Sequence, residues 1–339
     1  MKKLISHFVS IKLRAARWLA LPALTVLLVT AGSTMSQQNS PDTQSPHTLK
    51  VSTEVVNVLA IVKDKKGHLI PDINKDDFEL TEDNTPQEIR YFSKQTDTPL
   101  TLGILVDTSP SQQRVLPLEQ EEGKAFIHQV IKPKDMAFVL HFDLEVDLLQ
   151  DFTGDTKMLS RAIDETVING GGGGVLPGTF PNSRACCTYL YDAIYLASND
   201  LLKNEVGRKV IILLTDGEDE GSKEKLETAL QAAQRSDVMI YSIEISDRMF
   251  YPRMGMGYSG DGVLKKLSND TGGRVVEVNS TRDVGKAFQE IADELRTQYS
   301  LGYTPSNNHR DGSFRKIQVK VRNQDYKIQA RRGYYAPSG

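Results

Sequence analysis

Residues 98–298 alternate between short apolar runs and longer stretches in which apolar residues recur at helical spacing. The predicted strands lie at 102–106, 136–142, 146–149, 210–214, 238–245 and 275–278, and the predicted helices at 115–131, 156–167, 188–202, 223–235, 262–268 and 282–298. Fully apolar strands that alternate with helices are typical of a parallel sheet covered on both faces. The pattern therefore predicts an α/β domain built on a doubly wound, mostly parallel sheet.

The two segments that flank this domain have the alternation of β-strands. In residues 49–97 the face expected to be buried consists of Val51, Val55, Leu59 and Ile61. In residues 299–339 the corresponding face consists of Ile317, Val319, Val321 and Ile328. Neither segment is long enough to bury a core alone. We therefore expect both ends of the chain to pair into one β domain, into which the α/β domain is inserted.

The first 36 residues have the pattern of a secretory signal peptide. Five Lys and Arg residues precede an apolar run at 18–31, and small residues follow it. The run is shorter than the about 20 residues that a membrane-spanning helix needs, although an uncleaved anchor is the alternative. No Cys follows closely, which argues against a lipid anchor. We expect residues 1–36 to be removed on export and residues 37–48 to form a disordered leader. The mature chain is then periplasmic or extracellular, and it contacts a membrane only if the signal peptide is retained.

The amino-acid composition excludes several classes of protein. The chain has 41 Lys and Arg against 44 Asp and Glu, so it lacks the basic excess expected of a nucleic-acid-binding protein. Hydrophobic residues at 39% and charged residues at 25% exclude a polytopic membrane protein and a largely disordered chain. The two Cys residues, Cys186 and Cys187, are too few for a disulfide scaffold or a four-Cys zinc site. Their role stays open.

Polar residues follow two of the predicted apolar strands. Asp107, Ser109 and Ser111 come after the first strand in the sequence DTSPS, and Asp216 comes after the fourth. Thr188 opens the helix predicted after a glycine-rich loop, so its hydroxyl is expected at the same edge of the sheet. In an open α/β sheet, ligands bind beyond the carboxyl ends of the strands. Carboxylate and hydroxyl oxygens suit a hard cation such as Mg²⁺ or Mn²⁺. The alternative is that DTSPS is a polar turn with Asp107 as a helix N-cap.

Residues 98–298 resemble a von Willebrand factor type A domain, which has a Rossmann-like fold, and DTSPS resembles the metal-ion-dependent adhesion site of that family. The resemblance implies a divalent cation, Mg²⁺ or alternatively Mn²⁺ or Ca²⁺, held by five residues: Asp107, Ser109, Ser111, Thr188 and Asp216. One departure is Pro110, at a position often held by a small residue, because proline stiffens the loop and removes an amide donor. The flanking segments resemble those of a bacterial subgroup of exported proteins, through DDFEL at 76–80, YSLGYT at 299–304 and RGYY at 332–335.

The resemblance implies an exported, cation-dependent protein-binding module for adhesion or assembly, and not an enzyme. Its partner would be a protein that offers a carboxylate to the metal, because neutral hydroxyl ligands leave a divalent cation incompletely neutralised. Two alternatives remain: a periplasmic scaffold or assembly factor with a structural metal, and a metal-dependent hydrolase. The hydrolase is disfavoured because no His lies near the motif in the sequence, so no general base is evident.

Two weaker patterns are interpreted as surface features. Residues 255–260 match G-x-G-x-x-G, but about nine residues separate them from the preceding strand, whereas a dinucleotide-binding turn follows its strand at once. Asp143, Glu145 and Asp147 alternate along one face of a predicted strand, and we expect them to form a solvated edge.

Overall fold

The computed structural model describes residues 55–95, 98–168, 188–245, 260–278 and 283–338, which belong to one compact unit that spans residues 52–339. Several segments lie outside these ranges: the predicted signal peptide and leader, the glycine-rich loop at 170–174, Cys186, Cys187, and all but the last residue of the G-x-G-x-x-G motif. Among the helices of the described ranges, none is both long enough and apolar enough to cross a membrane.

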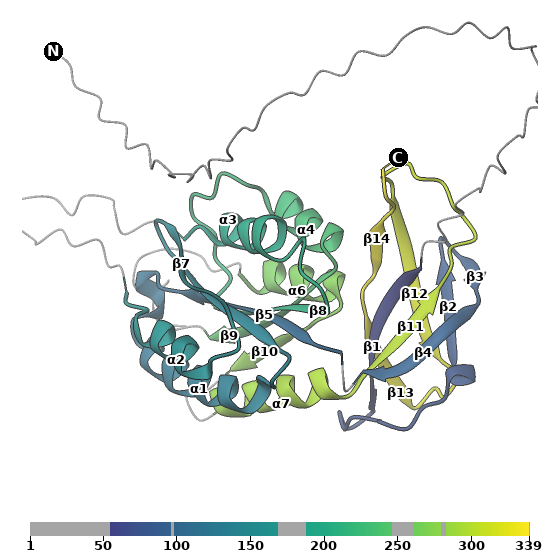
Figure 1. Cartoon of the computed structure of the whole chain (residues 1–339), viewed down its shortest axis with the longest axis horizontal. Helices are drawn as coiled ribbons and strands as arrows, with labels where there is room; N and C mark the ends of the chain where they lie inside the picture. The colour runs from purple at the N-terminus through teal and green to yellow at the C-terminus, as the bar shows by residue number, and fades with distance from the viewer. Residues whose placement is uncertain (1–54, 96–97, 169–187, 246–259, 279–282, 339) are drawn as a thin grey trace, which may run out of the picture. The chain divides into compact units, whose positions relative to one another are not determined.

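A six-stranded sheet in the order β10-β9-β8-β5-β6-β7 forms the centre of the α/β domain (Figure 1). Its strands are β5 (Leu100–Asp107), β6 (Met136–Phe142), β7 (Val146–Thr153), β8 (Arg208–Thr215), β9 (Val238–Ile245) and β10 (Val275–Val278). All neighbouring strands are parallel except β6 and β7, which are antiparallel. Every residue of β5 and β9 is buried, as expected for strands covered on both faces. The predicted doubly wound, mostly parallel sheet is confirmed.

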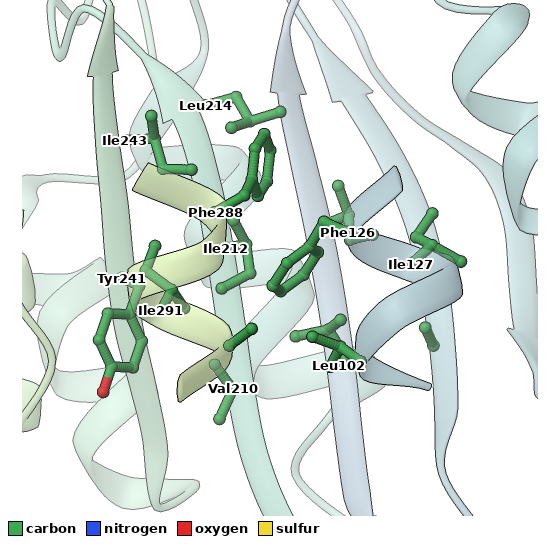
Figure 2. Close-up of a cluster of buried hydrophobic side chains, with 14 of the residues drawn as sticks. Leu102, Phe126, Ile127, Val210, Ile212, Leu214, Tyr241, Ile243, Phe288 and Ile291 are labelled. Atoms are coloured by element: carbon green, nitrogen blue, oxygen red, sulfur yellow. The ribbon is translucent and has the colours of Figure 1, made fainter. Parts of the chain in front are cut away.

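Helices cover both faces of this sheet. On one face α1 (Leu116–Val130), α2 (Thr156–Asp164) and α7 (Val284–Arg296) share a hydrophobic core with the strands. On the other face α3 (Leu190–Tyr195), α4 (Leu226–Arg235) and α6 (Gly260–Thr271) share a second core. Figure 2 shows the first core, where the rings of Phe126 in α1 and Phe288 in α7 lie 5.0 Å apart between their centroids. Burial of each such side chain contributes about 1.5–3 kcal/mol, so this core holds α1 and α7 on the sheet.

The helix predicted over 188–202 begins later than expected. α3 starts at Leu190, and it continues as a π-helical turn over Leu196–Leu201. Thr188 lies instead in an isolated bridge with Glu220, in which the two backbone N–H groups donate to the opposite carbonyl oxygens at 3.1 and 3.0 Å. Because both backbone groups of Thr188 are used in this bridge, the prediction that Thr188 opens the helix was wrong.

The segments on either side of the α/β domain form two antiparallel four-stranded sheets, in the orders β13-β1-β11-β4 and β14-β12-β2-β3 (Figure 1). The strands are β1 (Val56–Asp64), β2 (Phe78–Glu82), β3 (Thr85–Gln87), β4 (Ile89–Gln95), β11 (Gln298–Tyr303), β12 (Phe314–Val321), β13 (Tyr326–Ala330) and β14 (Gly333–Tyr335). A 3-10 turn, Lys75–Asp77, precedes β2. Strand β1 pairs with β11 and β13, and β2 pairs with β12. Each sheet therefore joins strands from both flanking segments, as the predicted fold class requires.

The face of β1 that packs against the β-domain core differs from the prediction. The buried stripe consists of Val56, Val58, Ala60 and Val62, which share a core with the predicted residues Ile317 and Val319. Val55 is 44% exposed, whereas Ile61 is buried in the core of the α/β sheet. Val51 lies outside the described residues. Because apolar residues occupy both faces of β1, the period of two did not specify which face meets the core.

The buried carboxyl group of Glu82 connects strands from the two flanking segments. Tyr303 and Tyr334 donate hydrogen bonds of 2.6 and 3.0 Å to Oε2 of Glu82, and all three side chains are buried. These residues lie on β11, β14 and β2, so the network spans both sheets of the β domain. It gives a structural role to Tyr303 in the sequence at 299–304 and to Tyr334 in the sequence at 332–335.

Candidate metal centre

The two predicted acidic ligands lie at the ends of neighbouring parallel strands. Asp107 is the last residue of β5, and Asp216 follows Thr215, the last residue of β8. Strands β5 and β8 pair in parallel register up to Val106 and Leu214, so their carboxyl ends meet at one edge of the sheet. Asp107 and Asp216 are both almost fully buried, at 0% and 1% exposure. The edge therefore holds two carboxyl groups that water hardly reaches.

Hydrogen bonds fix the first loop at this edge. Asp107 accepts a bond of 2.9 Å from the N–H of Ser109 through Oδ1 and one of 2.5 Å from the hydroxyl of Thr215 through Oδ2. The hydroxyl oxygens of Ser109 and Ser111 are 3.0 Å apart, and both residues are buried. Pro110 begins a 3-10 turn, Pro110–Gln112, at a position where a backbone N–H has no partner within the turn. The departure at Pro110 is therefore compatible with the loop.

Thr188 is joined to the segment that follows β8. The bridge between Thr188 and Glu220 attaches the buried residue Thr188 to the segment that follows Asp216. Gly217 turns that segment sharply, with φ of 85°, and a Cβ there would lie 2.8 Å from the carbonyl oxygen of Gly260. The sequence after β8 thus needs a glycine so that the loop can pass between the strand end and α6. The DTSPS loop, Thr188 and Asp216 therefore all lie at the carboxyl edge of the sheet.

The electrostatics of the edge favour a cation. Burial, followed by the charge of Asp216, raises the pKa of Asp107 to about 7. Two ionised carboxylates in a site of low dielectric repel each other, and a divalent cation removes that repulsion. Asp107 keeps lone pairs beyond those used by the bonds from Ser109 and Thr215, whereas Oδ1 of Asp216 accepts a bond of 3.2 Å from the N–H of Glu218. The set of two carboxylates and three hydroxyls therefore fits a hard divalent cation such as Mg²⁺.

A third buried carboxyl near this edge was missed by sequence reasoning. Glu119 lies in the first turn of α1 with 1% exposure, and neither of its oxygens has a hydrogen-bond partner among the described residues. Burial raises the pKa of Glu119 well above its ordinary value, and the charges of Asp107 and Asp216 raise it further. The sequence offers only an acidic residue in a first helical turn, a common feature that gives no sign of a site.

Sequence reasoning also missed a polar chain beside Asp107. Thr108 donates a hydrogen bond of 2.6 Å to Oδ2 of Asp143, and its Oγ1 is 3.0 Å from Nδ1 of His141. Since a hydroxyl has one proton, Nδ1 of His141 is assigned as the donor in the second contact. Asp143 is 1% exposed, so the prediction that it belongs to a solvated edge was wrong. His141 also shows that a histidine distant in sequence approaches the motif, because β6 is the neighbour of β5.

Residues 186–294, about a third of the chain, match the sequence model of the von Willebrand factor type A domain family. The matched range contains Thr188 and Asp216, and it begins after the loop of Asp107, Ser109 and Ser111. The predicted family resemblance is confirmed. The first loop lies outside the matched range, so the assignment of Asp107, Ser109 and Ser111 to a metal site stays a prediction.

Several solved structures are similar to the chain at low identity. They include the conserved hypothetical protein BatB from Bacteroides thetaiotaomicron, with 17% identity, coverage of 57% of this chain and 98% of that chain, and a TM-score of 0.42. The vWF domain of the type V pili tip protein Mfa5 from Porphyromonas gingivalis has 14% identity, coverage of 58% and 94%, and a TM-score of 0.43. Proximal thread matrix protein 1 from the mussel byssus, with a zinc-occupied MIDAS motif, has 15% identity, coverage of 60% and 50%, and a TM-score of 0.44.

A curated relative is an uncharacterized protein of Borreliella burgdorferi, which is 24% identical over 241 residues. The alignment covers 66% of this chain and 62% of that protein, so the chain spans less than two thirds of its relative's length.

Proposed function

We propose that this chain, which contains a von Willebrand factor type A domain, is an exported module that binds a protein partner through a divalent cation. The cation would be held by Asp107, Ser109, Ser111, Thr188 and Asp216. The observation that carries the proposal is the pair of buried carboxyls, Asp107 and Asp216, at the carboxyl edge of the sheet beside buried hydroxyls. Without a positive charge, burial of both carboxylates in ionised form is unfavourable.

The donor set indicates which cation and which partner chemistry to expect. All the donors are oxygens, which favours Mg²⁺, with Mn²⁺ and Ca²⁺ as alternatives. When bound, the cation would supply a Lewis-acidic position for a carboxylate from the partner protein. Three of the five ligands are neutral hydroxyls, so the cation would keep an affinity for a further, anionic ligand.

The role in protein binding is supported by the family match, and the export is supported by the pattern of residues 1–36. The rival assignment is a periplasmic scaffold in which the metal is structural and the β domain makes the contacts. The rivals differ in one property: a partner bound through the cation leaves when the cation is removed, whereas a partner bound by the β domain stays.

Two measurements test the proposal together. Calorimetry of the mature chain with Mg²⁺ and Mn²⁺ measures cation binding directly. A pull-down from the native cell envelope, with and without a chelator, then measures whether the bound partner depends on the cation. The Ser109→Ala and Thr188→Ala variants should lose the partner while they keep a native unfolding transition. Asp151→Ala, at an exposed position of β7, serves as the control. Partner binding that survives the chelator contradicts the proposal and favours the scaffold.

A further inference from the structure

Glu119 is a buried acidic residue that the proposed ligand set leaves without a role. Its side chain points into the protein from the first turn of α1, and both carboxyl oxygens lack a hydrogen-bond partner among the described residues. Leaving a buried polar group unsatisfied destabilises the folded protein, and more so if the group is charged. A buried carboxyl of this kind is expected to have a partner that is a water molecule or an ion.

The surroundings of Glu119 point to the candidate metal centre. Backbone hydrogen bonds run from the N–H of Glu119 to Val115, from the N–H of Val115 to Gln112 and from the N–H of Gln112 to Ser109, so they tie the first turn of α1 to the loop of the site. In agreement with this place, burial raises the pKa of Glu119, and the charges of Asp107 and then Asp216 raise it further. Gln112 contributes a second unsatisfied acceptor, because its Oε1 is buried without a partner while its Nε2 donates to Ser111 at 3.3 Å. Three buried acceptor atoms of Glu119 and Gln112 therefore have no donor among the described residues, which is the arrangement expected beside a hydrated cation.

Glu119 is not placed as a further direct ligand. Within the described ranges there is no group of three or more His, Cys, Asp or Glu residues that could hold a metal ion. Mg²⁺ usually keeps several water molecules, whose protons point away from the ion and need acceptors. A buried carboxyl just beyond the ligands supplies such acceptors.

We infer that Glu119 is a positioning residue of the cation site, which accepts hydrogen bonds from the hydration water of the cation and thereby strengthens cation binding. The inference rests on the proposed function, because it requires a cation at this edge. It assigns to α1 a part in the site that neither the DTSPS motif nor the matched range of the family includes. A purely structural carboxyl at the same place would affect folding and leave cation affinity unchanged.

The Glu119→Gln variant separates these two roles. It keeps the size of the side chain and removes its charge, and Glu121→Gln makes the same change at an exposed position of the same helix. We expect calorimetry with Mn²⁺ to show at least tenfold weaker binding for Glu119→Gln and unchanged binding for Glu121→Gln. The metal-free Glu119→Gln protein should be at least as stable as the wild type in urea, because folding no longer buries a carboxyl that must either take up a proton or carry a charge beside Asp107 and Asp216.

A second variant tests whether position matters beyond charge. Glu119→Asp keeps the charge and withdraws the carboxylate by one methylene group, so it should bind Mn²⁺ about as weakly as Glu119→Gln. Wild-type affinity in Glu119→Asp, or in Glu119→Gln, overturns the positioning role and leaves the proposed cation site intact. If the wild-type chain itself binds no Mn²⁺, the proposed function fails and the inference falls with it.

Discussion

The hydroxyl of Thr215 donates a hydrogen bond of 2.5 Å to Asp107 and so joins the end of β8 to the end of β5. The bond places Asp107 beside the residue that follows Thr215, which is Asp216. The pairing of β5 with β8 and the hydroxyl of Thr215 therefore determine where the carboxyl groups of Asp107 and Asp216 lie.

Replacing Asp107 with Ala should abolish divalent-cation binding and leave the sheet folded. The variant loses hydrogen bonds from Ser109 and Thr215, which destabilises by about 1–3 kcal/mol, while the removal of a buried carboxyl beside Asp216 offsets part of that loss. Calorimetry with Mg²⁺ and circular dichroism check the two parts. Unchanged Mg²⁺ affinity in a folded variant would contradict the assignment of Asp107 to the site.

The stability of the metal-free protein should fall as the pH rises from about 4 to about 7. The pKa of Asp107 is raised by burial and by the charge of Asp216, from 3.8 to about 7. In this window the folded protein keeps a proton that the unfolded chain has released, so stability is greatest at the acid end and decreases by up to about 4 kcal/mol. Urea unfolding in the presence of a chelator measures the slope. The cation competes with this proton, so Mg²⁺ affinity should increase over the same window.

The Asp107→Asn variant is the control for this pH dependence, because it cannot titrate at this position. Its stability should change less steeply between pH 4 and 7 than that of the wild type. An equal slope in both proteins would show that another group carries the titration.

Replacing Tyr303 with Phe should destabilise the β domain by about 1–3 kcal/mol, because it removes a donor from the buried carboxyl of Glu82. Tyr334 would remain as the other donor. Tyr326→Phe, on β13, alters a half-buried tyrosine in the same domain and should have a smaller effect. Urea unfolding measures both changes. Equal losses in the free energy of unfolding would show that the bond to Glu82 contributes no more than the hydroxyl of Tyr326.

A chain that ends at Gln298 should expose apolar strands and aggregate. The truncation removes most of β11 together with β12, β13 and β14, so β1 loses both of its neighbours and β2 loses β12. Incomplete sheets of this size are marginal in water. Light scattering and hydrogen exchange check the expectation. Native protection of residues 56–95 in a soluble truncated chain would show that the N-terminal strands fold without the C-terminal segment.

The fold could be predicted from the sequence because its strongest signals are local. The runs that became β5, β8 and β9 are apolar on both faces, which is what a covered parallel strand requires. The DTSPS loop and Asp216 each follow such a run, so their place at the carboxyl edge follows from the direction of the strands.

The features that sequence reasoning missed depend on contacts between distant segments. Thr188 is held in an extended bridge by Glu220, and nothing near Thr188 in the sequence indicates this contact. Asp143 is buried, and Thr108, which follows the neighbouring strand, donates a hydrogen bond to it. Glu119 is unusual because it is buried without a hydrogen-bond partner among the described residues. This depends on how α1 packs on the sheet. Tertiary packing, rather than local propensity, decides each of these cases.

Gln95 of β4 pairs with Gln298 of β11, so the chain leaves the β domain and returns to it at adjacent positions. In an unfolded chain this pairing must close a loop of about 200 residues, at an entropic cost of about 4–5 kcal/mol. Once the inserted domain has folded, its two ends are already held close together, and most of that cost disappears. The order of folding follows from this geometry: the inserted domain is expected to form first, and β1 and β2 pair with β11, β12 and β13 only afterwards.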